Sequence, residues 1–484
     1  MIGRNNQPHF IIDKFTDNMF NGLINDLAIY ETALTREEIV SSYISIKKLF
    51  SEHELPVPDT AMDRNRYKDD KHRPQLHFMA PEHWMNEPHA PIYFYGQYHL
   101  FYQHNPIGPY WGNIHWGHAV SDDMVRWRDL PIALKPGQSD ADPDGCWSGS
   151  AVIDDEGIPV LFYTAGNLSQ SPSQLIASAK STFQEDRDND LIAWKKRDEP
   201  VVVQQEGQVW FGNFRDPFLW REEEIWYMLV GTGFLGVGGT AMLYTSNDLE
   251  NWTYRNYFYV GNYAKYPKSG RMWELPVFLK LGQSRLGEDR YIFIVNPWFG
   301  EPSEHYNKFM YYWIGTFEKE SYRFIPEEEA PQTFVFGEHF TGPSGFIEQR
   351  GRAIIFSLIQ DFRTDKQQYK AGWAHCAGLP IELKWGADNQ LTVAPIEELK
   401  ALRKSKLLSL SDKTMEKANE ALSIIQGDVL EILLELRPQS AEKYGIKLRC
   451  TADGAEETLI YYDRNMHEFN VDKTKSNLDL DVRI

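Results

Sequence analysis

The chain has 484 residues, a length that favours two or three domains. Hydrophobic residues make up 42% and aromatic residues 14%, so a sizeable core can form. The formal net charge of −19 argues against nucleic acid or an anionic membrane as a partner. The sequence also contains no run of the roughly 20 apolar residues that a membrane span requires, so we expect no membrane insertion.

The first predicted unit is residues 1–50. Residues 21–30 have the pattern of a strand, and Thr35 begins a helix with a capping pattern at its start. Together they resemble the last strand and closing helix of a laminin-G/concanavalin-like jelly roll, of which this segment would be a partial remnant. Residues 51–72 follow as a linker of mixed charge.

Residues 73–403 contain a repeat. Five short apolar strands recur every 61 to 67 residues, and the fourth residues of these strands are Phe101, Phe162, Leu229, Ile294 and Ile355. A near-constant period with strand-turn-strand content is typical of a β-propeller, here with five blades. The period exceeds the usual blade length of roughly 40–50 residues, so the loops must be long.

Three carboxylates occupy related places in this repeat. Glu87, Asp216 and Glu274 each lie in an aromatic, proline-bounded segment just before one of the apolar strands. A tight turn would explain any one of these segments. Three such segments at the same position of the repeat favour a functional role, because the innermost strands of a propeller surround one axis. Carboxylates converging on an aromatic funnel suit the chemistry of glycosidic bonds.

Cysteines and histidines give no sign of a metal site. The three cysteines lie far apart and fit neither a disulfide framework nor a ligand spacing. Seven of the 14 histidines fall between His77 and His118. However, His115 and His118 are three apart on a predicted strand, so they face opposite ways. No carboxylate or cysteine completes a ligand set, and we expect neither a metal nor another cofactor.

Residues 404–484 form the last predicted unit. Strand-like segments at residues 429–436, 445–449 and 458–462 suggest the start of a β-sandwich. These strands are too few to close two sheets, so we expect an incomplete sandwich and a fragment of a longer protein. The predicted fold is therefore all-β: a five-bladed β-propeller followed by a truncated β-sandwich.

Six motifs in order make the resemblance to a known family specific. They are His83-Trp84-Met85-Asn86-Glu87-Pro88, Phe101-Tyr102-Gln103-His104-Asn105-Pro106, Trp111-Gly112-Asn113-Ile114-His115-Trp116-Gly117-His118, Trp147-Ser148-Gly149-Ser150, Phe214-Arg215-Asp216-Pro217 and Met272-Trp273-Glu274-Leu275-Pro276. Together they resemble glycoside hydrolase family 32, the invertases, inulinases and levanases. The likeness runs from about residue 75 to 403 and into the C-terminal unit.

The resemblance implies an enzyme that hydrolyses β-fructofuranosidic bonds in sucrose, inulin-type or levan-type fructans with retention. By position, Glu274 would be the general acid/base and Asp216 would stabilise the oxocarbenium-like transition state. Glu87 would be the nucleophile that forms a covalent fructosyl-enzyme. The residues that would line the sugar site are Asn86, Gln103, Trp111, Trp147, Ser148 and Arg215.

The sequence departs from the family pattern at the nucleophile. The family motif reads Trp-Met-Asn-Asp-Pro-Asn-Gly, whereas this chain has Glu87 followed by Pro88, His89 and Ala90. Glutamate carries one more methylene, and misplacement on a scale of about 1 Å can cost roughly 10²-fold in rate. The altered residues that follow would compensate. Two alternatives stay open: fructosyl transfer that forms difructosides, and an inactive fructan-binding relative.

Two further departures are smaller. Leu275 stands where the family commonly has cysteine, and residues 341–345 replace an aromatic-Ala-Pro-Gln segment that would shape the subsite beyond the fructose. The expected partner is a fructose-containing oligo- or polysaccharide. A laminin-G-like module beside a glycosidase usually accompanies use of extracellular polysaccharide, so we expect a secreted or cell-surface protein.

Overall fold

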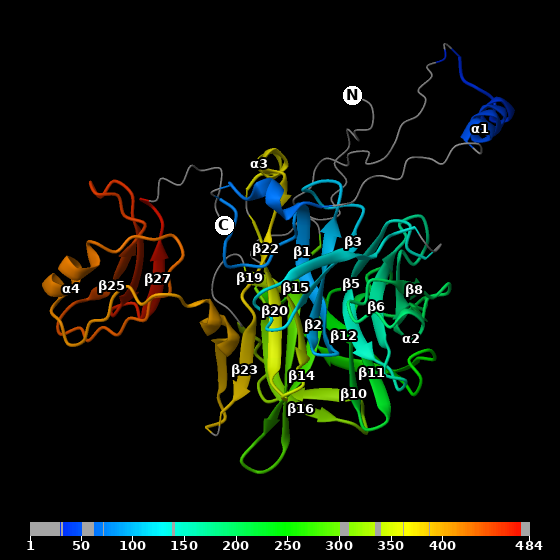
Figure 1. Cartoon of the computed structure of the whole chain (residues 1–484). Helices are drawn as coiled ribbons and strands as arrows, with labels where there is room; N and C mark the ends of the chain where they lie inside the picture. Colours follow the sequence, from blue (N-terminus) through cyan, green and yellow to red (C-terminus); the bar gives the residue numbers. More distant parts are fainter. Residues whose placement is uncertain are drawn as a thin grey trace.

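The structure is a computed structural model that describes residues 30, 32–50, 62–70, 72–137, 141–300, 309–333, 340–361, 363–386 and 388–475. It is built mainly of strands (Figure 1). The predicted capped helix is confirmed as α1 (Arg36–Phe50), where Glu38 N–H donates to Thr35 Oγ1 and Thr35 N–H donates to the Glu38 carboxylate. The strand predicted at residues 21–30 lies outside the described residues apart from Tyr30.

Five sheets follow one another along the chain, and apart from one two-residue strand in four of them, the strands of each sheet pair in chain order. The first sheet holds β1 (His83–Phe94), β2 (Gln97–Asn105), β3 (His115–Ser121), β4 (Arg128–Leu134) and β21 (Trp373–Ala374). The second holds β5 (Gly145–Ile153), β6 (Pro159–Gly166), β7 (Gln174–Ser181), β8 (Trp194–Lys196) and β9 (Val202–Val203). The third holds β10 (Arg215–Glu222), β11 (Ile225–Phe234), β12 (Gly238–Ser246) and β13 (Thr253–Val260).

The fourth and fifth sheets complete the set. The fourth holds β14 (Met272–Gln283), β15 (Asp289–Trp298), β16 (Tyr311–Glu318), β17 (Arg323–Pro326) and β18 (Gln332–Thr333). The fifth holds β19 (Phe340–Ile347), β20 (Ala353–Ile359), β22 (Cys376–Ala377), β23 (Ile381–Trp385) and β24 (Leu391–Pro395). The five apolar strands predicted from the repeat are β2, β6, β11, β15 and β20, the second strand of every sheet.

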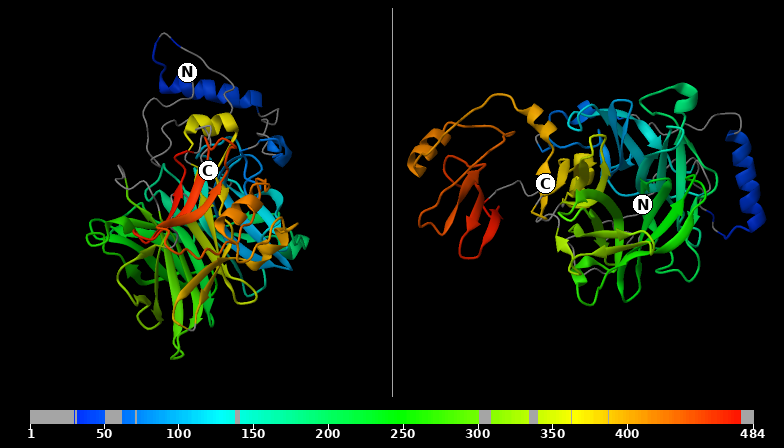
Figure 2. Two further views of the ribbon diagram at one scale, coloured as in Figure 1. Left: turned by 90° about the vertical axis from the view of Figure 1, so that its left-hand side faces the viewer. Right: turned by 90° about the horizontal axis from the view of Figure 1, so that it is seen from below.

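The five first strands form a closed ring. β1 contacts β5, β5 contacts β10, β10 contacts β14, β14 contacts β19, and β19 returns to β1. Seen from below, the sheets follow one another around a common centre (Figure 2). β21, late in the chain, pairs in parallel with β1 and so ties the last part of the ring to the first sheet. The predicted five-bladed β-propeller is confirmed.

Aromatic side chains fill the space between neighbouring blades. Phe258 of the third sheet packs on Phe278 and Phe293 of the fourth, with ring centroids 4.9 and 5.3 Å apart. All three rings are buried. Much of the aromatic content of the chain therefore serves blade packing, which burial of apolar area stabilises.

The C-terminal unit contains one antiparallel sheet of β25 (Lys443–Leu448), β26 (Thr458–Asp463) and β27 (Glu468–Asp472). The strands predicted at residues 445–449 and 458–462 are confirmed. The strand predicted at residues 429–436 is wrong, because no described strand pairs with this segment and most of its apolar side chains are exposed, Leu433 by 85%. The division of the chain at residues 50, 72 and 403 stays a prediction.

The remaining helices are short. They are η1 (Arg64–Tyr67), α2 (Phe183–Asp186), η2 (Pro267–Ser269), α3 (Asp365–Ala371), η3 (Glu397–Leu402) and α4 (Met415–Leu422). Within the described part of the chain, no helix is long and apolar enough to cross a membrane.

Candidate active site

The first strands of three blades carry the three predicted carboxylates to one place. Glu87 lies on β1, Asp216 on β10 and Glu274 on β14. Asp216 feels the negative charge of both glutamates, and its carboxylate accepts a hydrogen bond at 3.0 Å from the backbone N–H of Leu275. Glu87 and Asp216 are about 5% exposed, whereas Glu274 is partly exposed. The structure thus brings the three residues together, as their common position in the repeat predicted.

A β-bulge lies at the equivalent point of every first strand. The pairing with the second strand slips between Met85 and Pro88, Trp147 and Gly149, Arg215 and Phe218, Glu274 and Val277, and Thr341 and Ser344. Glu87, Ser148 and Asp216 lie inside these slips, and Glu274 lies at the edge of its own. A bulge bends its strand and re-aims the side chain at that point. The bulges therefore explain why the side chains at this position of the five first strands point toward the common axis of the blades.

Hydrogen-bond donors converge on the Glu87 carboxylate. Its Oε1 accepts a hydrogen bond from Ser148 Oγ at 2.5 Å and another from Gln103 Nε2 at 2.9 Å. Gln103 Nε2 also lies 2.6 Å from Ser148 Oγ. Gln103 and Ser148, predicted as sugar ligands, therefore contact the carboxylate predicted as nucleophile. The same hydroxyl lies 3.0 Å from Nδ1 of His89, a residue not assigned to the site from the sequence.

Glu274 is held by an arginine and an amide. Arg215 donates from Nη2 at 2.9 Å and from Nε at 3.1 Å to Glu274 Oε1, and Asn296 Nδ2 lies 3.3 Å from Oε2. The guanidinium also lies over the Trp298 ring, 5.3 Å from its centroid. Asn296 in turn accepts a hydrogen bond from the Thr341 hydroxyl, which links the fourth blade to the fifth.

Asp216 has an unusual backbone and an unusual charge environment. Its φ angle is +62°, in the left-handed region, and its N–H donates to Thr164 Oγ1 at 2.8 Å. Burial raises the pKa of Asp216 well above its usual range, and the negative charges of Glu274 and Glu87 add to this effect, while Arg215 opposes it. Strain and a perturbed pKa at one residue are typical of functional sites.

Two of the predicted sugar-site residues are tryptophans that lie close to each other. Trp111 and Trp147 lie with ring centroids 6.1 Å apart, and Trp111 is partly exposed while Trp147 is buried. Asn86, next to Glu87 on β1, is also partly exposed. Their role in lining a sugar site stays a prediction.

Four residues that the sequence did not indicate complete these contacts: His89, Thr164, Asn296 and Trp298. Asn296 pairs directly with Glu274 across the β14–β15 ladder, a pairing set by the register of the two strands and not marked by any residue pattern. The contact of Thr164 with Asp216 depends on how two neighbouring blades pack.

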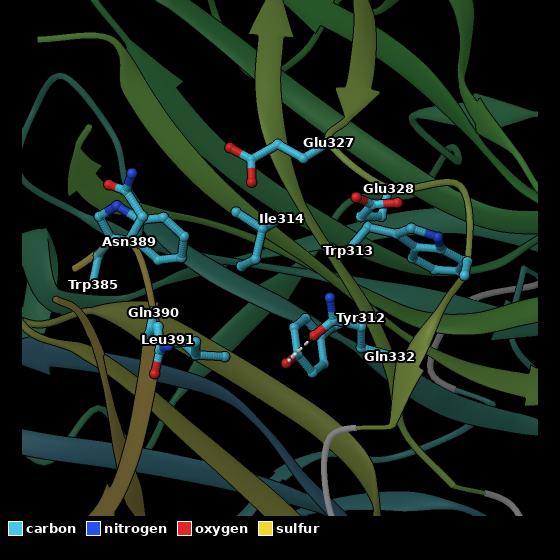
Figure 3. Close-up of a pocket in the computed structure, with 11 residues that line it drawn as sticks. Tyr312, Trp313, Ile314, Glu327, Glu328, Gln332, Trp385, Asn389, Gln390 and Leu391 are labelled. Carbon is cyan, nitrogen blue, oxygen red and sulfur yellow. Dashed lines mark hydrogen bonds between the residues drawn. The ribbon is translucent and has the colours of Figure 1, made fainter. Parts of the chain in front are cut away.

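A hollow lies elsewhere in the fold, lined by none of these carboxylates (Figure 3). It has a volume of about 280 Å³ and lies between outer strands of the fourth and fifth blades. Tyr312, Trp313 and Trp385 line it together with polar side chains, and Tyr312 donates to Gln332 at 2.7 Å. None of the predicted site residues lines it.

Comparison with known families agrees with the motifs. Residues 77–395 match the model of the glycosyl hydrolases family 32 N-terminal domain, and residues 398–482 match the family 32 C-terminal model. The chain belongs to glycosyl hydrolase family 32. It is a glycoside hydrolase, as the motifs predicted.

Curated relatives of this family 32 enzyme cover most of its length. A sucrose-6-phosphate hydrolase of Zymomonas mobilis is 33% identical over 414 residues, which cover 83% of this chain and 77% of the relative. A β-fructofuranosidase of Oryza sativa, insoluble isoenzyme 3, is 30% identical over 381 residues, 73% of this chain and 62% of the relative.

Solved structures of the family share the fold. The fructan 1-exohydrolase IIa of Cichorium intybus, crystallised with 1-kestose, superposes with a TM-score of 0.67 at 24% identity and covers 86% of this chain and 84% of its own. A sucrose-6-phosphate hydrolase of Lactobacillus gasseri gives a TM-score of 0.67 at 23% identity, with 86% and 80% covered.

Proposed function

We propose that this family 32 enzyme hydrolyses the β-fructofuranosidic bond of sucrose or of fructans, with retention, through a covalent fructosyl-enzyme. The observation that carries the proposal is the convergence of Glu87, Asp216 and Glu274 at one ring of bulges. The printed activities of its relatives, sucrose-6-phosphate hydrolase and β-fructofuranosidase, support the same chemistry.

Glu87 is the proposed nucleophile. Its Oε1 accepts hydrogen bonds from Gln103 and Ser148, and donors of this kind favour the ionised form that attacks the anomeric carbon. The longer side chain, compared with the aspartate of the family motif, starts from a bulged backbone and lies against Gly342, where no side chain competes for space.

Glu274 is the proposed general acid/base. It would protonate the leaving oxygen in the first step and activate water in the second. Arg215 and Asn296 hold its carboxyl group in position from two sides. Asp216 would accept hydrogen bonds from hydroxyls of the fructosyl ring, and these bonds would strengthen as positive charge develops on the ring in the transition state.

Sugar release tests the proposal. The unaltered enzyme and its Glu87→Gln and Glu274→Gln variants are incubated with sucrose, sucrose 6-phosphate, inulin and levan, and free fructose is measured. We expect fructose from the unaltered enzyme on at least one substrate, and a loss of at least about 10³-fold in both variants. Difructosides without free fructose would indicate transfer instead, and fructan binding by a folded protein without any product would indicate a binding role.

A further inference from the structure

His89 is a buried histidine two residues after the proposed nucleophile. Its side chain is 0% exposed, and its ring packs against Trp116 with centroids 4.2 Å apart. Nδ1 lies 3.0 Å from Ser148 Oγ, the hydroxyl that donates to Glu87. Nε2 is buried and has no hydrogen-bond partner among the described residues. The only hydrogen bond between the imidazole and the described site residues is therefore the one at Nδ1.

Counting protons at Ser148 fixes the direction of each hydrogen bond. A hydroxyl has one proton to donate and can accept two hydrogen bonds. An ionised Glu87 can only accept, so the Ser148 proton points to its Oε1. The Gln103 amide nitrogen can only donate to Ser148 Oγ. The proton of the serine is then already used, and Nδ1 of His89 must donate as well.

Burial supports the same protonation state. It lowers the pKa of His89 to about 3, so the ring is neutral over the working range and carries one proton. Placing that proton on Nε2 would leave a buried donor without a partner, and Nδ1 would face a serine with no proton to give. The Nδ1–H form satisfies the one donor that the ring has.

We infer that His89 is a positioning residue for the nucleophile: its Nδ1–H fixes the Ser148 hydroxyl so that it donates to Glu87. This inference rests on the proposed function of Glu87. Trp116 packs against the His89 ring, and the ring donates to the Ser148 hydroxyl. Ser148 and Gln103 in turn donate to one carboxylate oxygen of Glu87. His89 follows the glutamate on the same bulged strand, so nucleophile and positioning residue are set by one segment.

The tautomer is tested without any activity. Long-range proton–nitrogen correlation spectra of the enzyme with ¹⁵N-labelled histidine, assigned by comparison with the His89→Asn variant, report which ring nitrogen carries the proton. We expect a neutral Nδ1–H ring from pH 5 to 8. A neutral Nε2–H ring or a charged ring would overturn the inference, even if the enzyme hydrolyses fructosides as proposed.

Kinetics test the consequence. His89→Leu keeps an apolar side chain beside Trp116 but removes the donor, whereas His89→Asn keeps an N–H that can reach the serine. In His89→Leu we expect kcat to fall roughly 10- to 100-fold with KM changed less than threefold, because a misplaced nucleophile affects the chemical step. We also expect the acidic limb of the kcat/KM profile to move to higher pH, and His89→Asn to restore part of both.

A matched control separates positioning from folding. His118 is equally buried but bonds to His99 and not to the site. His118→Leu is expected to lower the thermal midpoint without moving the acidic limb. An unchanged kcat and acidic limb in folded His89→Leu would refute the positioning role. An unaltered enzyme without fructosidase activity would instead refute the proposed function, with the tautomer result standing on its own.

Discussion

Gly342 of the fifth blade lies directly against Glu87 of the first. A Cβ atom added to Gly342 would lie 2.9 Å from Glu87 Cβ, closer than real side chains approach, and the φ angle of this glycine is +61°. The position where the first and last blades meet thus has room for the Glu87 side chain only because residue 342 has none. The departures at residues 341–345 and at Glu87 are therefore in contact in the fold.

The first prediction concerns this contact. Gly342→Ala is expected to lower kcat by at least about 10-fold and to destabilise the fold by roughly 1–3 kcal/mol, because the new methyl group displaces Glu87 and the backbone is strained. Gly351→Ala in the same blade is the control, since it has φ +80° but no atom within 4 Å of an added Cβ. Equal losses of activity in the two variants would show that backbone strain, not the Glu87 contact, is responsible.

The second prediction concerns the hold on Glu274. Arg215→Lys keeps the positive charge but cannot donate two N–H groups in a fixed geometry or place a guanidinium over Trp298. We expect kcat/KM to fall roughly 10- to 100-fold, the scale of one charged hydrogen bond. Steady-state kinetics on the best substrate, together with a thermal melt, provide the check. Near-normal kcat/KM in the lysine variant would mean that charge alone suffices.

The sequence predicted the carboxylates because each lies in a short motif at a repeated slot. It could not supply the contacts around them, since these arise from register and from packing between blades. Asn296 reaches Glu274 through a ladder pairing, and the bulges that aim the side chains are not visible as a residue pattern. The wrong strand at residues 429–436 has the same origin: apolar residues suit a strand, but a strand forms only where a partner pairs with it.

The third prediction concerns acid stability. Burial lowers the pKa of His99 and His115 to about 4, and the pKa of His104 to about 3. Below the unfolded value of about 6.5 the unfolded chain takes up protons that the folded chain does not, so the free energy of unfolding falls as pH falls from 6.5 toward 4. Each such histidine contributes about 1–2 kcal/mol of this loss by pH 5.

Denaturant unfolding at pH 7 and pH 5 measures this loss, and the change of slope across the interval reports the protons taken up. A constant free energy of unfolding between these two values would contradict the prediction. His118→Leu removes another buried histidine whose pKa lies well below its usual range, so this variant should lose less stability over the same interval than the unaltered chain does.

The last prediction concerns Asp216 and separates stability from activity. Its raised pKa means that the folded state disfavours the ionised form, so the charge destabilises the fold at pH values above the folded pKa and does not do so below the unfolded pKa of about 3.9. Asp216→Asn removes the charge and keeps an oxygen that can accept the N–H of Leu275.

We expect this variant to melt several degrees higher than the unaltered enzyme at pH 8, with the difference shrinking toward pH 4. Activity should fall at least about 10²-fold at the pH values where Asp216 of the unaltered enzyme is ionised, because a neutral amide stabilises the developing positive charge less than a carboxylate does. Thermal melts and fructose release measured on the same samples across this range check both parts. A variant that melts lower at pH 8 would mean that the carboxylate stabilises the fold at this position, contrary to the direction of its pKa shift.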